Sequence, residues 1–498
     1  MRRPLVSRPY LGAWLVLLWS AALAYSTYVN FLGLSFRPLE WSPDDRLGVN
    51  YYVYHYSAEA LLAGEDFYAA TPPGFGDHYT YLYPPVTILT WVPFTALESF
   101  HGFLLLTAIT IAVSAASAVA IVRFVEDGWD RTLGWLDVGA IFLFFLGIHS
   151  TGTLNFGNIN LLLAAGIVFG FLALDRGREV TAGVLFGAVA LMKVFPALVG
   201  LYLLRIRSWA AIAGATATGL GGLAASAIVF GPDTLYRFFF EILLPRSDTA
   251  AFVGGYPPDG TYYVTIQRPL SHIIWNVYPD APAAVLPIAA ALVLGAVLAY
   301  CYLGLETKTD HLVAIHATLT ATVIFMSSFR FYLALVFLSW VPLLYVWHEE
   351  PDDQRRGQAV VLGVGLLAVA YLWYAPLIWS YWPLVVAFFA AGVGVVYAWY
   401  EDVVPTLFVL GGLIASITSR PSSMVSNVQE YPGPLSTLLE PLVTVGTLQL
   451  YGLLVMLAAC LLYKYRQGVG VADVREAGRV LRTDLEEGTR TVRARLNG

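Results

Sequence analysis

The chain has 498 residues, of which 58% are hydrophobic and only 12% are charged, with a mean hydropathy of +0.67 and a net charge of −6. Apolar runs of about 20 residues recur along most of the chain, which excludes an ordinary soluble globule and predicts an all-α polytopic membrane protein. Cys301 and Cys460 both lie in apolar stretches, and two such cysteines indicate neither a disulfide framework nor a metal site.

The first apolar run covers residues 11–34 and follows Arg2, Arg3 and Arg8. Its length and the lack of a small-residue cleavage site favour a retained first helix over a cleaved signal peptide. Positive charge stays on the cytoplasmic side of membranes, so we expect the N-terminus inside and the first loop, residues 35–81, outside.

Further spans follow at regular intervals. We predict them at about 100–124, 134–150, 157–174, 180–204 (a re-entrant pair), 208–230, 283–304, 312–327, 331–347, 358–375, 379–399, 404–418 and 440–463. In this arrangement the basic clusters between spans all lie inside, as the positive-inside rule requires. The stretch Pro84–Leu97 is either a loop or an interfacial, half-membrane helix.

Long outer loops at 35–81, 231–282 and 419–440 are rich in Tyr, Trp, Pro and Gly and are long enough to form a site. The tail 466–498 alternates Arg with acidic residues at helical spacing, which predicts a polar cytoplasmic helix. We therefore expect a transmembrane catalytic domain over residues 1–465 and a cytoplasmic C-terminus.

The segment Lys193-Val194-Phe195-Pro196 breaks an apolar run that has arginines at both ends, Arg176 and Arg178 before it and Arg205 and Arg207 after it. Cytoplasmic arginines at both ends require the chain to enter the bilayer and return on the same side. Lys193 is then an intramembrane cation at the tip of a helical pair. Such a residue marks a functional site, and we expect its partner to be the phosphate of a lipid carrier.

Aromatic residues crowd the first outer loop, from Asn50 to Tyr56 and again at Tyr68 and Tyr83. Such rings either stack on sugars or form an aromatic belt at the membrane interface. The order of Val53-Tyr54, Gly64, Tyr68 and Tyr83-Pro84-Pro85 resembles the first outer loop of polyprenyl-phosphate-mannose-dependent transferases in glycosyltransferase family 87, a branch of the GT-C membrane fold.

Two further segments carry the resemblance, which covers residues 35–205. Gly157-Asn158-Ile159-Asn160 is similar to the Gly-Gln-Val-Asn helix start of that family. The segment 183–196, which ends in Lys193-Val194-Phe195-Pro196, is similar to its glycine-rich helix closing in Lys-x-x-Pro.

The resemblance implies a GT-C-like bundle of about 12–14 transmembrane or re-entrant helices. It also implies an inverting transfer of mannose from a polyprenyl (dolichyl) phosphate to a hydroxyl of a lipid-linked glycan or glycolipid on the outer face. A carboxylate of the first loop is the general base and cations hold the leaving phosphate. No cofactor is expected, neither nucleotide nor metal, and the partners are the donor, the acceptor and the bilayer, with no nucleic acid.

The chain departs from the family at the base, because Asn50 stands where the family has an aspartate. An amide cannot accept the proton in that role. Asp44 or Asp45 supplies the base from just upstream, or the chain is an inactive or engineered variant, or the alignment register differs. Asp66 and Glu59 are weaker candidates for the base.

Other candidate residues are placed by their position in the predicted topology. Arg268 and Arg330 lie in outer loops, where a guanidinium can bind phosphate with two hydrogen bonds. We expect Tyr54, Tyr68, Tyr83, His149, Asn158 and Asn160 to contact substrate. The pair Asp77-His78 lacks a third ligand nearby and does not predict a metal site.

Two alternatives belong to other functional classes. A transporter also uses broken helices and an intramembrane lysine, but the two halves of the chain show no inverted repeat and the outer loops are long. A flippase or ligase of lipid-linked sugars shares the fold family, and a ligase requires a wider outer cleft.

Overall fold

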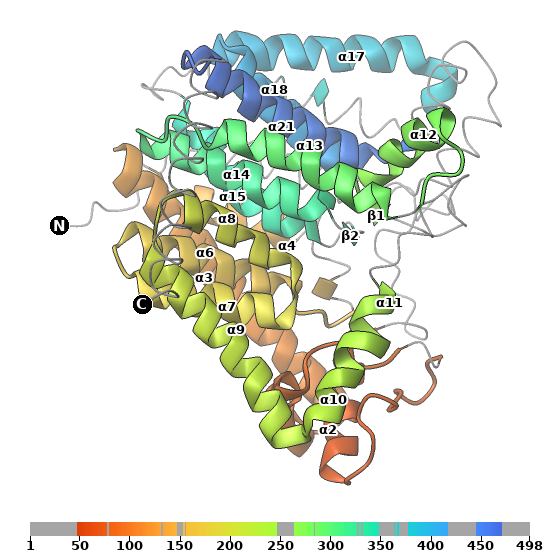
Figure 1. Cartoon of the computed structure of the whole chain (residues 1–498). Helices are drawn as coiled ribbons and strands as arrows, with labels where there is room; N and C mark the ends of the chain where they lie inside the picture. The colour runs from red at the N-terminus through yellow and green to blue at the C-terminus, as the bar shows by residue number, and fades with distance from the viewer. Residues whose placement is uncertain are drawn as a thin grey trace, which may run out of the picture.

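The structure is a computed structural model in which the helices form one bundle, with α17, α18 and α21 at one side and α2 with α10 at the other (Figure 1). It describes residues 47–76, 79–130, 133–146, 153–154, 156–246, 263–282, 284–325, 328–329, 332–347, 363, 366–367, 377–416 and 445–470. Within these ranges the chain is helical apart from loops and a two-residue antiparallel ladder, in which Tyr263 pairs with Phe329. The predicted all-α fold of a polytopic membrane protein is therefore confirmed.

The described helices, in chain order, are α2 (Val49–Leu62), the 3-10 helices η1 (Pro85–Thr90) and η2 (Val92–Ala96), α3 (Ser99–Trp129), α4 (Trp135–Leu146), α6 (Asn160–Asp175), α7 (Glu179–Met192), the 3-10 helix η3 (Phe195–Leu198), α8 (Val199–Arg205), α9 (Trp209–Phe230), α10 (Pro232–Arg237), the π-helix η4 (Phe238–Leu243), α11 (Leu244–Arg246), α12 (Gln267–Val277), α13 (Val285–Cys301), α14 (Lys308–Phe325), α15 (Leu333–Val346), α17 (Leu377–Tyr400), α18 (Val403–Ala415) and α21 (Leu448–Arg466). The strands are β1 (Tyr263–Val264) and β2 (Ser328–Phe329).

Three helices of the described ranges, α3, α9 and α21, are long and apolar enough to cross a membrane by their length and composition. Shorter apolar helices accompany them, among them α6, α13 and α15. Large apolar side chains such as Ile228 on α9 and Leu292 on α13 are exposed, at 83% and 70%. Exposed apolar surface of this extent indicates a protein that is covered by lipid.

The predicted spans coincide well with the helices that the structure describes. The span predicted at 208–230 is α9, which begins at Trp209, and the span at 100–124 is α3, which continues to Trp129. The predicted spans at 11–34 and, for the most part, 358–375 lie outside the described residues, as do the loop 419–440 and the tail from residue 471.

The segments predicted as outer loops hold more helix than their sequences indicate. Loop 35–81 contains α2, loop 231–282 contains α10, α11 and α12, and the stretch Pro84–Leu97 forms the two 3-10 helices η1 and η2 instead of a loop. Pro85 and Pro93 stand near the starts of these short helices, where the missing proline N–H costs no hydrogen bond.

The core of the bundle is formed around α14 and α15. Every residue of α15 is buried, and so is most of α14, which is typical of a helix that is apolar on all sides. The indole of Trp340 donates a hydrogen bond to the carbonyl oxygen of Phe408 at 2.7 Å and so links α15 to α18. This core supports the elements that carry the candidate site.

The predicted helical pair broken at Lys193 is confirmed. Helix α7 ends at Met192, Lys193 is extended, and Pro196 lies in the first turn of η3, from which α8 continues. Proline lacks the N–H that a continuous helix needs. Lys193 contacts Asn160 at the start of α6, whereas Tyr202 of α8 lies near Asp175 at the end of α6. The chain therefore runs up to Lys193 along α7 and back along α8.

Close packing of α7 on α9 holds this pair in place (Figure 1). A Cβ atom at Gly183 would lie 2.1 Å from the carbonyl oxygen of Ala211, and one at Gly187 would lie 2.6 Å from that of Ala215. Small residues that let two backbones approach are the usual contact between membrane helices. The glycine-rich character of this segment is thus explained by packing.

Candidate functional site

The ammonium of Lys193 lies at the meeting point of three segments that are distant in sequence. Its Nζ donates a hydrogen bond to Oδ1 of Asn160 at 2.6 Å and another to the hydroxyl of Tyr332 at 3.1 Å. Both partners are neutral, and within the described residues no carboxylate forms an ion pair with Lys193. A partly buried cation held by neutral dipoles keeps its charge available to an anion.

Asn160 is the first residue of α6, and its position follows from the turn before it. Gly157 has a left-handed backbone (φ 65°), and the side chain of Asn158 accepts a hydrogen bond from the N–H of Asn160 at 3.2 Å. Asparagine side chains stabilise helix starts in this way. Because Asn158 orients Asn160, which in turn contacts Lys193, the structure joins two of the predicted motifs.

The start of α2 lies against the same turn. The N–H of Asn50 donates to the carbonyl oxygen of Phe156 at 2.8 Å. A Cβ atom at Gly157 would lie only 2.7 Å from the Cβ of Tyr51, so this approach requires glycine. The position where the sequence predicts the base is therefore adjacent to the asparagine turn.

Three predicted tyrosines form a connected cluster beside Lys193. The hydroxyl groups of Tyr54 and Tyr83 lie 2.9 Å apart, and the hydroxyl of Tyr68 donates to the carbonyl oxygen of Tyr83 at 2.7 Å. Tyr54 also stacks on Trp91, with ring centres 4.3 Å apart. Burial raises the pKa of Tyr54 and Tyr68, so both phenols stay protonated and remain hydrogen-bond donors.

The tyrosine cluster is buried, with exposed fractions of 2–7% for the three side chains. These rings pack against one another instead of presenting open faces for a sugar. Tyr83, like Tyr332, lies close enough to Lys193 to interact with it electrostatically. Their contact with substrate stays a prediction, and the hydroxyl groups are the parts that the geometry directs to the site.

Side chains of α9 and α10 contact the segment that carries the tyrosine cluster. Arg237 of α10 forms an ion pair with Asp66 at 2.5 Å and lies over the ring of Tyr68. The hydroxyl of Ser226 on α9 accepts a hydrogen bond from the N–H of Val86 at 3.0 Å. These contacts fix the loop that carries Tyr68 and Tyr83.

The two weaker candidates for the base both have partners. Burial opposes ionisation of Asp66, but hydrogen bonds from Arg237 and from the N–H of Tyr68 outweigh it and lower the pKa of this carboxyl. Glu59 forms an ion pair with His55 at 3.2 Å. A carboxylate with a lowered pKa and a bound guanidinium is a poor proton acceptor, which disfavours Asp66 as the base.

Arg268 is buried at the start of α12, which docks on the end of α14. The N–H of Ile266 donates to the carbonyl oxygen of Ile324 at 2.8 Å, and the side-chain amide of Gln267 donates to that of Phe325 at 2.7 Å. The 3-10 helix η3, which follows Lys193, packs against the same α14. The segments that carry Arg268 and Lys193 therefore both pack against α14. The structure describes no direct contact between the two side chains.

Four predicted site residues lie outside the described residues: Asp44, Asp45, His149 and Arg330. The pair Asp77-His78, for which no metal site is predicted, also lies outside them. In contrast, no pattern in the sequence singles out Tyr332, which lies inside a predicted span. A tyrosine at a helix start is the pattern of an interfacial belt, and only the fold brings its hydroxyl to Lys193.

Comparison with known proteins agrees with this arrangement. The family model of glycosyltransferase family 87 matches residues 81–328, about half of the chain, and this range includes Tyr83, Asn160, Lys193 and Arg268. A polyprenol-phosphate-mannose-dependent alpha-(1-2)-phosphatidylinositol pentamannoside mannosyltransferase of Mycolicibacterium smegmatis is 27% identical over 404 residues, which cover 76% of this chain and 88% of the relative. The protein of the same name from Mycobacterium tuberculosis is 26% identical over 378 residues, covering 72% and 79%. The chain belongs to glycosyltransferase family 87 and is a membrane glycosyltransferase.

Proposed function

We propose that the chain transfers mannose from a polyprenyl phosphate to a hydroxyl of a glycolipid or lipid-linked glycan on the outer membrane face, with inversion of configuration. The names of the two mycobacterial relatives support the donor and a phosphatidylinositol mannoside as the kind of acceptor. The observation that carries the proposal is the ammonium of Lys193, placed inside an apolar bundle where its hydrogen-bond partners among the described residues are the neutral side chains of Asn160 and Tyr332.

Lys193 neutralises the phosphate of the donor and stabilises the charge that grows on it as the sugar leaves. A phosphate leaving group needs charge stabilisation and no proton, so a fixed cation in a dry site suits this step. Asn160 and Tyr332 hold the ammonium in position. The polyprenyl tail enters from the bilayer, and Arg268 and Arg330 add a second contact to the phosphate.

The base acts on the opposite face of the sugar. The new bond forms between the acceptor oxygen and the anomeric carbon while the bond from that carbon to the phosphate oxygen breaks. The acceptor proton passes to a carboxylate, and the polyprenyl phosphate leaves with the electron pair of the broken bond. We assign the carboxylate to Asp44 or Asp45, which precede the start of α2, the element that Phe156 holds beside Asn158.

The remaining polar residues orient the two substrates. We assign Asn158, Tyr54, Tyr68 and Tyr83 to the sugar side of the site and His149 to the acceptor. The hydroxyl groups of Tyr54 and Tyr83 are linked to each other, and that of Tyr68 is held by the backbone of Tyr83, so the three tyrosines present a fixed set of donors and acceptors.

The experiment uses the full chain, purified and reconstituted in lipid, with radiolabelled polyprenyl phosphate mannose and a phosphatidylinositol mannoside acceptor, with and without EDTA. We expect transfer in both conditions. Lys193→Ala should lower the rate of transfer at least ~100-fold, the usual effect of removing one stabilising group from an anionic transition state.

The control is Arg176→Ala, because Arg176 is an exposed cation that directly follows α6 at the end opposite Asn160. It should leave transfer unchanged. Normal transfer by a folded Lys193→Ala variant would contradict the proposed role, and a wild-type chain that binds the donor without transferring the sugar would contradict the proposed activity.

A further inference from the structure

An apolar pocket lies between α3, α6, α8, α14 and α15, away from the Lys193 site. Its volume is about 270 Å³, and its walls are apolar side chains such as Ile121, Ile167, Phe171 and Leu338. Asn160 begins α6 at the Lys193 site, whereas Asp175, 15 residues later, lines the rim of the pocket. At ~1.5 Å per residue the two ends of α6 are about 22 Å apart.

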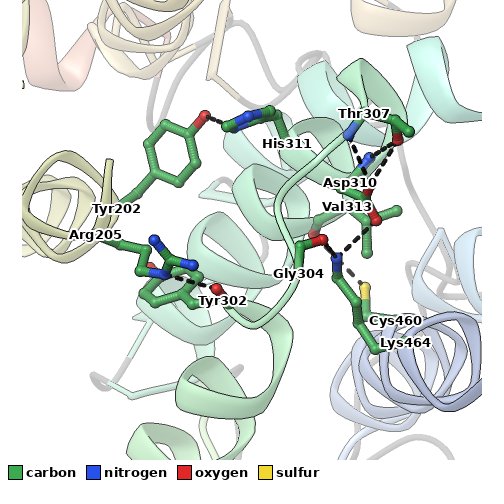
Figure 2. Close-up of polar contacts among 10 residues, drawn as sticks. All are labelled: Tyr202, Arg205, Tyr302, Gly304, Thr307, Asp310, His311, Val313, Cys460 and Lys464. Atoms are coloured by element: carbon green, nitrogen blue, oxygen red, sulfur yellow. Dashed lines mark hydrogen bonds and ion pairs between the residues drawn. The ribbon is translucent and has the colours of Figure 1, made fainter. Parts of the chain in front are cut away.

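Four of the five polar side chains that line this pocket gather at one end: Asp175, Tyr202, Lys308 and His311. The fifth, Ser339, lies on α15. The hydroxyl of Tyr202 and Nδ1 of His311 lie 2.9 Å apart, which links α8 to α14 across the rim (Figure 2). Lys308 is exposed, and no carboxylate of the described residues forms an ion pair with it. An apolar cavity with a polar rim at one end matches a ligand that is itself amphiphilic.

Polar contacts on both sides hold the rim in place. Lys464 of α21 forms an ion pair with Asp310 at 2.7 Å and donates to the carbonyl oxygen of Gly304 at 3.0 Å (Figure 2). On the other side, Nε of Arg205 donates to the carbonyl oxygen of Tyr302 at 2.7 Å. The loop that leads into Lys308 is thus fixed between α8 and α21. A rim fixed before binding lowers the entropy cost of holding a ligand.

We infer that this pocket binds a phosphate-bearing lipid, with one hydrocarbon chain in the cavity and the phosphate at Lys308. The volume is slightly below the ~300–1,000 Å³ of ordinary ligand pockets, which suits a single chain and excludes a two-tailed body. The carboxylate of Asp175 on the same rim favours a headgroup that carries a hydroxyl or an amine next to its phosphate.

This site is distinct from the donor site at Lys193, because the rim lies at the other end of α6 and among the residues predicted to face the cytoplasm. A glycerophospholipid and a polyprenyl phosphate share the required chemistry. The two differ in chain shape, since an acyl chain is straight and an isoprenoid chain is branched, so competition between them identifies the source.

The test uses the full chain in nanodiscs that contain phosphatidylglycerol with a photoactivatable group at the end of one acyl chain. After illumination, the labelled residues are located by mass spectrometry. We expect labelling of residues on α6 and α15, and Ile315→Trp, which fills the cavity from α14, should reduce this labelling at least tenfold. Leu338→Phe serves the same purpose if the first variant does not fold.

The headgroup contact is tested separately. Lys308→Ala should weaken labelling by phosphatidylglycerol about tenfold, the effect of losing one hydrogen bond to a charged group. Arg176→Ala, an exposed cation next to the rim residue Asp175, is the control and should have no effect. Loss of labelling on adding polyprenyl phosphate would identify the isoprenoid as the ligand. Labelling that is unchanged by both cavity-filling variants, or absent from the pocket with either lipid, would overturn the inference.

Discussion

The ammonium of Lys193 donates to the hydroxyl of Tyr332 at 3.1 Å and lies 4.4 Å from the centre of the same ring. Tyr332→Phe keeps the ring and removes only the oxygen, so it isolates the hydrogen bond. We expect kcat to fall about tenfold, since a hydrogen bond to a charged group contributes ~1.5–3 kcal/mol, while the thermal stability stays close to wild type. An unchanged kcat would show that Asn160 alone positions Lys193.

Substitutions around the start of α2 identify the base. Removing a general base lowers the rate by about 10²–10⁴-fold, so one of Asp44→Asn and Asp45→Asn should show this loss and the other should not. Asn50→Asp restores the family's carboxylate beside Phe156 and should raise the rate of transfer. Initial rates at saturating donor distinguish these outcomes, and full activity in the double variant Asp44→Asn/Asp45→Asn would exclude both residues.

Gly157→Ala should disturb the site through two effects. The backbone at Gly157 is left-handed (φ 65°), which costs a residue with a Cβ roughly 1–2 kcal/mol, and the new Cβ would collide with the Cβ of Tyr51 at 2.7 Å. Gly177→Ala is the matched control, because Gly177 also has a left-handed backbone (φ 71°) but no atom within 4 Å of the added Cβ.

We therefore expect both glycine variants to lose stability and only Gly157→Ala to lose transfer activity per folded molecule. Thermal unfolding and transfer rates of the same preparations give the comparison. Equal loss of activity in the two variants would mean that backbone strain alone, and not the contact between α2 and the asparagine turn, matters for transfer.

The buried ion pair between Asp310 and Lys464 predicts a large effect on stability. Lys464 is fully buried, and removing one member of a buried pair costs ~3–5 kcal/mol. Lys464→Met should lower the unfolding midpoint strongly, and Lys464→Met/Asp310→Asn should recover part of the loss. Arg466→Ala, which breaks the exposed pair with Asp402 two residues further along α21, should cost less than ~1 kcal/mol.

The ion pair between Asp66 and Arg237 gives a prediction about pH. The pKa of Asp66 is lowered in the folded state, so its contribution to stability is complete above the unfolded pKa of about 4 and is lost as the pH falls through the folded value. Both side chains are partly exposed, at 46% and 37%, so the effect is below ~1 kcal/mol. Asp66→Asn should lose this part of the acid dependence of the unfolding midpoint, and an unchanged acid limb would contradict the assignment.

The sequence predicts the long helices and the break at Lys193 because both depend on local signals. Apolar runs set the helices, and Pro196 with an intramembrane lysine marks the break. The 3-10 helices and α2 carry no such signal. Helix α2 is buried against several elements, so its apolar residues, Val49, Tyr51 and Tyr54 among them, do not follow a single helical face.

Helix α12 shows why periodicity failed in the second long loop. Its polar residues Gln267, Arg268 and Ser271 are buried, while Ile273 and Val277 are exposed, the reverse of the pattern of a helix on a soluble protein. Likewise, the contact between Tyr332 and Lys193 depends on packing between segments 139 residues apart. A local sequence pattern cannot predict a contact over such a separation.

In the predicted topology, the break at Lys193 also determines on which side of the bilayer the rest of the chain continues. A continuous helix over residues 179–205 would be about 40 Å long, more than the ~30 Å of the hydrocarbon core, and it would exit on the opposite side. Every helix from α9 onward would then be inverted, with Arg205 and Arg207 translocated. In that topology, the turn at Lys193 also sets the orientation of the whole second half of the protein.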